Sequence, residues 1–219
     1  MKYFPAAGVW SAVLCGLLSC NGIFGNIYDT AEVPDEASAY GFIRPCEGNS
    51  AGRIYIDARS YTQWVYLDFD AERAVAVEID DTSGVPAMWD IAIHRYDART
   101  NEGQATETSY GDFAAWTKAG CPVADGGVSD IWSTERIMTD LSGMLDSVIV
   151  YAPSFYNPCL SHWLDVDLRV MPPIYTPSNR VYTLRFDNGK RMALRLVNYM
   201  NDVGTKGYMT IDYIYPVQN

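Results

Sequence analysis

The chain has 219 residues and a formal net charge of −11, with 16 Lys and Arg against 27 Asp and Glu. This length suits one domain with a sizeable hydrophobic core. The acidic balance argues against binding to nucleic acid or to an anionic membrane surface, both of which require clustered Lys and Arg.

The first 20 residues have the pattern of a bacterial lipoprotein signal. An apolar run at 6–18 is too short to span a bilayer as a permanent helix. Ser19 is a small residue directly before Cys20, and Leu17 lies three positions before that cysteine. We expect 1–19 to be a cleaved signal peptide, Cys20 to carry lipid, and this lipid to be the only membrane anchor. The alternative is an ordinary secretory signal whose cysteine is incidental.

Residues 20–49 are expected to form a flexible tether, because glycine, proline and acidic residues alternate there without periodicity. Residues 50–219 are expected to form a single mostly β domain of antiparallel strands with long loops and little helix. Short runs rich in β-branched and aromatic residues indicate the strands. The expected strands are 53–59, 64–70, 73–79, 89–100, 147–153, 162–171, 179–187, 191–201 and 207–216.

Three details complete this expectation. Residues 101–133 carry many glycines and are predicted to form a long loop, which their aromatic residues would keep ordered. A short window at 137–145 is the one candidate for a helix. Asn188-Gly189 lies between two alternating runs and predicts a hairpin with a type I′ turn.

Signatures of known enzyme classes are missing from the sequence, which has no G-x-S-x-G, P-loop, dinucleotide-binding or H-E-x-x-H motif. Asp165 and Asp167 alternate along an expected strand, so we interpret them as a solvated face and not as a glycosidase acid pair. No motif in the sequence therefore supports an enzymatic function.

Cysteine and histidine are scarce. Cys46, Cys121 and Cys159 remain beyond the lipidation position and allow one disulfide and one free thiol, with the pairing left open. His94 and His162 are the only histidines and are interpreted as structural. A zinc site built from Cys and His is not expected.

Three methionines stand near the ends of expected strands. Most methionines fill gaps in a core, and composition alone favours that interpretation for Met138, Met144 and Met171. Met171 directly precedes two prolines, however, and Met144 follows Ser142-Gly143. Two thioethers on neighbouring loops could clamp a flat ligand from both sides. Thioether sulfur is a soft, neutral ligand that suits haem iron or Cu(I).

Four segments resemble the HmuY family of haem-binding lipoproteins (haemophores) of Bacteroidetes. They are WVYLDF from Trp64, WDIAIHRYDARTNE from Trp89, PIYTPSNRVYTLRFD from Pro173 and GYMTIDYIYP from Gly207. The matching segments run over 54–217. The resemblance implies a mostly β domain that holds one haem b between loops and passes it to a TonB-dependent outer-membrane receptor. Host haemoproteins are a candidate haem source, and no catalysis is implied.

Family members use either two histidines or two methionines as axial ligands. In the histidine type, the second ligand lies shortly before the P-x-Y-x-x-S-N-R string, where this chain offers Met171 and no histidine. The resemblance therefore implies Met144 and Met171 as the axial pair, with Met138 as the substitute for Met144. If this were wrong, His162 would be the only nearby imidazole. The expected pocket walls are Phe155, Tyr156 and Ile174.

Two arginines, Arg136 and Arg169, are candidates for binding the haem propionates, although a solvated surface charge is the preferred interpretation of each. The expected location is the outer membrane, lipid-anchored and facing either the surface or the periplasm, with release from the cell as a further option. Two alternatives remain open. One is an adhesive or structural surface lipoprotein of the same fold without haem, and the other is a secreted carbohydrate-active protein.

Overall fold

The computed structural model of the chain describes residues 40–44, 51–146 and 148–217. The expected signal peptide, Cys20, most of the expected tether and Cys46 lie outside these residues. The described residues all belong to one compact unit, Ala31–Asn219. Within this part of the chain, no helix combines the length and the apolar character needed to cross a membrane.

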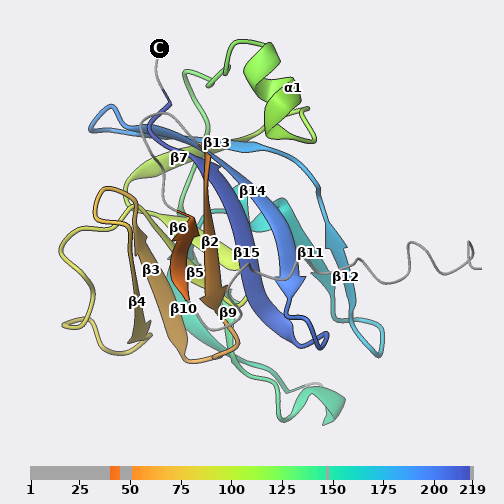
Figure 1. Cartoon of the computed structure of the whole chain (residues 1–219). Helices are drawn as coiled ribbons and strands as arrows, with labels where there is room; N and C mark the ends of the chain where they lie inside the picture. The colour runs from red at the N-terminus through yellow and green to blue at the C-terminus, as the bar shows by residue number, and fades with distance from the viewer. Residues whose placement is uncertain (1–39, 45–50, 147, 218–219) are drawn as a thin grey trace, which may run out of the picture. The chain divides into compact units, whose positions relative to one another are not determined.

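The described strands form two larger antiparallel sheets and two ribbons (Figure 1). The seven-stranded sheet has the order β1 (Gly41–Arg44), β2 (Ala51–Asp57), β15 (Lys206–Ile214), β14 (Arg191–Met200), β13 (Tyr182–Phe186), β7 (Gly103–Glu107) and β8 (Val128–Ser129). The four-stranded sheet has the order β4 (Arg73–Glu78), β3 (Gln63–Asp68), β5 (Ile91–His94) and β6 (Asp97–Thr100). The prediction of a mostly β, antiparallel fold is confirmed.

Each ribbon is a pair of antiparallel strands. The first joins β9 (Ile131–Asp140) to β10 (Val150–Tyr156), and the second joins β11 (Leu164–Asp167) to β12 (Ile174–Pro177). The described helical segments are short. They are α1 (Phe113–Lys118) and the 3-10 turns η1 (Met144–Asp146) and η2 (Leu160–Trp163).

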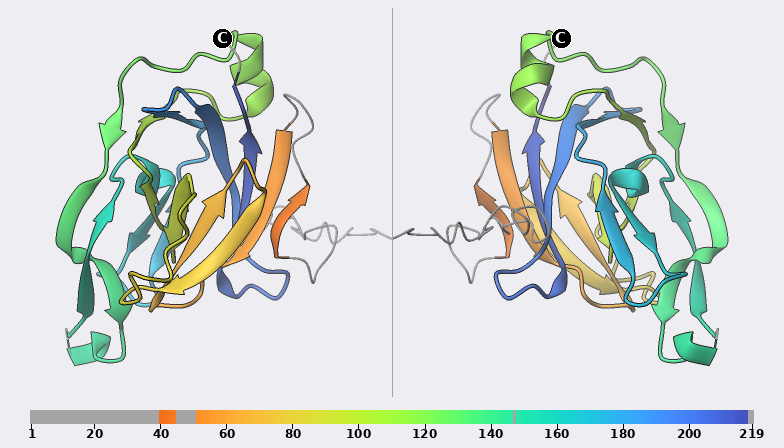
Figure 2. Two further views of the ribbon diagram at one scale, coloured as in Figure 1. Left: turned by 90° about the vertical axis from the view of Figure 1, so that its left-hand side faces the viewer. Right: turned by 90° about the vertical axis from the view of Figure 1, so that its right-hand side faces the viewer.

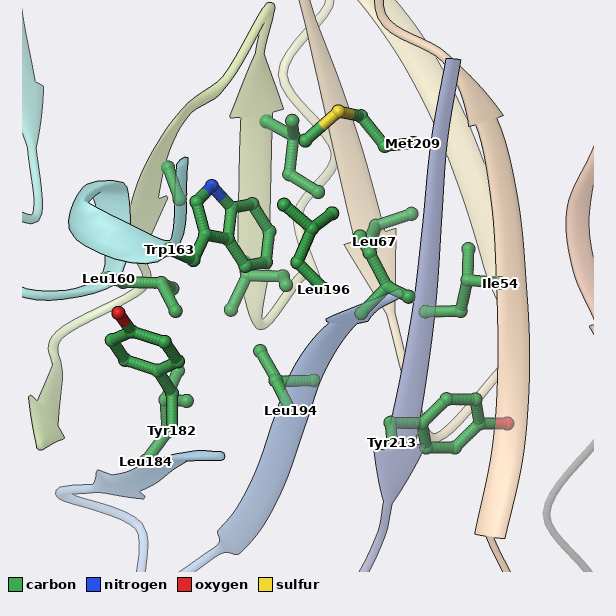
Figure 3. Packing of buried hydrophobic residues seen from close by; sticks show 14 of the residues in the cluster. Ile54, Leu67, Leu160, Trp163, Tyr182, Leu184, Leu194, Leu196, Met209 and Tyr213 are labelled. Carbon is green, nitrogen blue, oxygen red and sulfur yellow. The ribbon is translucent and has the colours of Figure 1, made fainter. Parts of the chain in front are cut away.

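The main core lies between the two larger sheets and draws side chains from both (Figure 3). Ile54 of β2, Leu67 of β3 and Leu194 of β14 are fully buried in it. Trp163 of η2 closes the core at one side, and its indole Nε1 donates to the carbonyl oxygen of Tyr96 at 2.8 Å. A buried tryptophan with its N–H satisfied combines a large apolar surface with no lost hydrogen bond.

The four-stranded sheet is buried on its other face as well. Trp64 and Tyr66 of β3 point there and form a second cluster with Val77 of β4. Ile137 of β9 belongs to this cluster, and Tyr156 of β10 packs against it. The β9–β10 ribbon is therefore anchored on the outer face of the four-stranded sheet.

Residues 89–100 form a hairpin, so the expected single long strand is wrong. β5 and β6 pair antiparallel, with His94 opposite Asp97, and Arg95 adopts a φ of 56° at the turn. The Arg95 guanidinium donates to the carbonyl oxygen of Arg59 at 2.8 Å and lies 4.3 Å from the centre of the Tyr61 ring. These tertiary contacts hold a turn that contains no glycine, proline or asparagine, so no local turn signal was present to predict it.

The stretch 101–133 also differs from the expected long loop, because it contains β7, α1 and β8. The expectation that its aromatic residues keep it ordered is confirmed at Trp116, which is fully buried. The helical window at 137–145 is wrong for its first half, since β9 continues through Asp140 and only η1 is helical. The strand expected at 162–171 begins with η2 and ends at Asp167.

Four residues inside the stretch expected as tether form strand β1. Gly41 and Phe42 pair with Tyr55 and Ile54 of β2. The Phe42 ring packs edge-on against that of Phe69, with centroids 5.4 Å apart. The expected tether is therefore wrong for Gly41–Arg44, because Phe42 gives this short edge strand an apolar anchor.

The hairpin at Asn188-Gly189 is confirmed, but its turn is not of type I′. A type I′ turn needs positive φ at both central residues, and here Gly189 has a φ of 83° while Asn188 is not in the positive region. The Gly189 N–H donates to the carbonyl of Phe186, and the Phe186 N–H donates to that of Lys190. This pattern is a tight turn followed by a glycine bulge, a common alternative hairpin connection.

Candidate functional site

A groove of about 480 Å³ runs between the β9–β10 ribbon and the segment formed by β11 and the residues after it. It is lined by Tyr96, Asp97, Glu135, Arg136, Met138, Tyr151, Asp165, Val166, Asp167, Leu168 and Arg169. The tip of the β9–β10 ribbon, which carries η1, and the loop between β11 and β12 project from the same end of the domain (Figures 1 and 2).

The three candidate methionines occupy different environments near this groove. Met138 lies on β9, is 5% exposed and belongs to the main core, although it also lines the groove. Met144 is half-buried and begins η1, at the tip of the β9–β10 ribbon. Met171 lies in the β11–β12 loop and is 63% exposed. Neither Met144 nor Met171 lines the groove. Met171 lies in the β11–β12 loop, whose residues Leu168 and Arg169 line it, and Met144 lies at the ribbon tip, beyond the lining residues of β9 and β10.

The three residues expected to form the pocket walls lie at different places in the structure. Tyr156 is half-buried on β10, and the Arg136 guanidinium lies 5.4 Å from its ring centre. Ile174 is 55% exposed at the start of β12, where it pairs with Asp167. None of these three residues lines the groove, and Phe155 lines a different cavity, next to Arg99.

A buried carboxylate holds one of the candidate propionate ligands. The Arg136 Nε donates to Oδ1 of Asp97 at 2.7 Å, and Asp97 is 1% exposed. Burial raises the pKa of Asp97 to about 6, and the Arg136 charge opposes this rise. Arg136 is thus fixed at the groove and is not a freely solvated charge. Arg169 remains largely exposed and pairs with Asp167 at 2.8 Å.

Sequence reasoning missed Tyr96 and Asp97 as groove residues. They were expected on a continuous strand, whereas the turn at Arg95 places them at the groove.

His162 is held by two carboxylates. Its Nδ1 lies 3.0 Å from Oε2 of Glu107, and its Nε2 lies 3.0 Å from Oδ2 of Asp165. Both ring nitrogens are engaged, which favours the structural interpretation. The hydrogen bond with Glu107, supported by the charge of Asp165, raises the pKa of His162 above 6.5.

This raised pKa has a predictable effect on stability. Because the folded pKa exceeds the unfolded one, the bridge stabilises fully below about pH 6.5 and its contribution is lost as pH rises through the raised pKa. We expect His162→Gln to destabilise the protein by about a few tenths of a kcal/mol more at pH 5.5 than at pH 8.5, since the bridge is half-exposed. Urea unfolding at both pH values measures this difference. An equal loss at both would contradict the bridge.

The other titratable candidates are structural. His94 is fully buried, its Nε2 is 3.0 Å from the carbonyl oxygen of Tyr61, and burial lowers its pKa to about 4. Cys121 and Cys159 are free thiols. Among residues 40–44, 51–146 and 148–217, no group of three or more His, Cys, Asp or Glu side chains is arranged to hold a metal ion.

The family model described as HmuY protein matches residues 60–213. A Bacteroides fragilis protein described as a lipoprotein has a crystal structure that matches with a TM-score of 0.77 and 44% identity, covering 85% of this chain and 100% of that one. A Bacteroides vulgatus protein described as an HmuY-like haem-binding protein matches with a TM-score of 0.76 and 46% identity, covering 83% and 100%.

A third structure, the apo HmuY analog of Tannerella forsythia, matches with a TM-score of 0.66 over 77% of this chain and 97% of its own. Its identity is 22%, so it shows the fold alone. No curated protein matches the chain. These matches show that the domain has the same β-structured fold as the two Bacteroides proteins. The chain belongs to the HmuY family.

Proposed function

We propose that the protein binds one haem b in the groove between the β9–β10 and β11–β12 ribbons and delivers it to a TonB-dependent outer-membrane receptor, without catalysis. The observation that carries the proposal is that both ribbons contribute residues to the groove and that the loops at their ends carry Met144 and Met171, although neither methionine lines the groove itself. Membership of the HmuY family and the description of a 46% identical relative as haem-binding support it.

Part of the groove fits the chemistry of haem, and four carboxylates, Asp97, Glu135, Asp165 and Asp167, complete its lining. Met138, Tyr151, Val166 and Leu168 supply an apolar lining for a porphyrin. Arg136, oriented by Asp97, and the exposed Arg169 supply cations for the two propionates. Met144 and Met171 would supply the axial thioethers, which are soft and neutral ligands for haem iron.

The remaining assignments concern attachment and delivery. We propose that residues 1–19 are a signal peptide and that lipid on Cys20 anchors the protein to the outer membrane. A 44% identical relative is described as a lipoprotein, which supports this assignment. A lipid anchor would keep the haem-loaded domain close to the receptor, where a tethered carrier has a raised effective concentration.

A hemin titration of the wild-type protein tests the proposal. We expect a Soret band that saturates at one hemin per chain, and the same result for Met88→Ala. Met88 is 62% exposed and lies on neither of the two ribbons, so it controls for the loss of an exposed methionine. A linear rise in absorbance without saturation would contradict haem binding. It would favour an adhesive or structural protein of the same fold.

A further inference from the structure

A second cavity, of about 450 Å³, lies outside the groove. Trp89 and Phe155 form its aromatic walls, and Arg99 and Asp130 lie at its base. Glu102 and Asp187 stand at its exposed margin. Its size is in the range of small-ligand pockets, and none of its lining residues lines the proposed haem groove.

The polar groups at the base of this cavity have partners within the protein, except for the buried Nε of Arg99, which has no hydrogen-bond partner among the described residues. The Arg99 guanidinium lies 4.6 Å from the Trp64 ring centre and 5.3 Å from that of Trp89. It also donates to the hydroxyl of Tyr66. Asp130 accepts from the backbone N–H of Thr100 at 2.8 Å and from other groups. The positive charge of Arg99 is therefore stabilised within the protein by the faces of the aromatic rings and by the carboxylate of Asp130.

The groups at the margin lack such partners. Within the described part of the chain, the carboxylates of Glu102 and Asp187 form no hydrogen bond or ion pair. Asn101 uses its amide N–H to bond the carbonyl oxygen of Trp89, which leaves its side-chain oxygen as an acceptor. The margin thus offers acceptors and negative charge, and a fitting ligand must bring donors and positive charge.

Exposed aromatic surface continues beside the margin. Phe155 is 49% exposed, and Trp132, which packs edge-on against it at 5.0 Å, is 57% exposed. Aromatic faces next to carboxylates favour a planar cation, because the guanidinium of arginine can stack on a ring while it binds a carboxylate through two N–H groups. A lysine ammonium or a neutral sugar would use only part of this arrangement.

We propose that this cavity is a second binding site and that it takes an arginine side chain of a peptide segment from a partner protein. The chain's net charge of −11 favours the approach of such a segment. The proposal is independent of haem binding, because the two sites share no lining residue.

The test uses the full chain and two tripeptides, acetyl-Ala-Arg-Ala-amide and its citrulline counterpart. Citrulline keeps the shape of arginine but is neutral. We expect saturable binding of the arginine peptide by NMR, weakened by salt, with citrulline at least about tenfold weaker. Equal binding of the two peptides, binding of neither, or saturable binding of methyl glucoside at concentrations where the arginine peptide does not bind would overturn the proposal.

Matched variants locate the site. Glu102→Gln combined with Asp187→Asn should weaken the arginine peptide by about tenfold. Asp80→Asn combined with Asp202→Asn removes two exposed carboxylates elsewhere and should leave its affinity unchanged. Equal effects of the two pairs would show a general charge effect and no site. The hemin titration should be unchanged in every variant, so a failure of haem binding remains distinguishable.

Discussion

Replacing Met144 and Met171 together with alanine is expected to abolish the Soret band of the hemin complex. Loss of groups outside the coordination sphere already costs about 10- to 100-fold in metal affinity, so loss of both axial donors should cost about a hundredfold or more. Each single variant should keep a weakened band with a changed position, because one thioether remains. Both residues lie in turn or loop segments and not in the main core, so the fold should persist.

Two controls make this result specific. Met88→Ala removes a thioether that is as exposed as that of Met171 and should bind hemin as the wild type does. Met138→Leu removes sulfur from the groove while nearly conserving core volume. If Met138→Leu lost the Soret band and Met144→Ala kept it, Met138 would replace Met144 as the ligand on the β9–β10 ribbon. A double variant that bound hemin with wild-type affinity would disprove methionine ligation.

Reduction of the iron should tighten binding. Methionine ligation raises the reduction potential of haem iron relative to ligation by two histidines. Ferrous haem should therefore bind more tightly than ferric haem, by about tenfold for each 59 mV by which the potential of the bound haem exceeds that of free haem. Titration with and without dithionite, together with spectroelectrochemistry, measures both quantities.

The matched variant for this prediction is Met171→His, at an exposed position where an imidazole can be accommodated. The new imidazole should supply one nitrogen ligand, lower the reduction potential of the bound haem and reduce the preference for ferrous iron. Equal or weaker affinity on reduction of the wild type would count against two methionine ligands.

Much of the sheet architecture follows from local pattern. β3 and β4 were expected within a residue or two, and the β13–β14 hairpin was expected with its first strand beginning three residues too early, because β-branched and aromatic runs bounded by turn residues are strong signals. The turn at Arg95 was missed because its positive φ is held by Arg59 and Tyr61, which are distant in sequence. β5 is buried on both faces, so alternation carried little information there.

The groove was only partly predictable. Met144 and Met171 were expected beside turns and prolines, and the structure places them in a 3-10 turn and a loop. The link between Asp97 and Arg136 was not expected, because it joins residues that are 39 positions apart in the chain. Phe155, Tyr156 and Ile174 were expected as groove walls, but none of them lines the groove, and Phe155 lines the other cavity.

The most direct measurement of the central claim is X-ray absorption at the iron edge of the hemin complex. The proposed function predicts two axial sulfur scatterers in the wild type and none in the variant that lacks Met144 and Met171. An iron environment of nitrogen and oxygen alone in the wild type would contradict axial ligation by this pair.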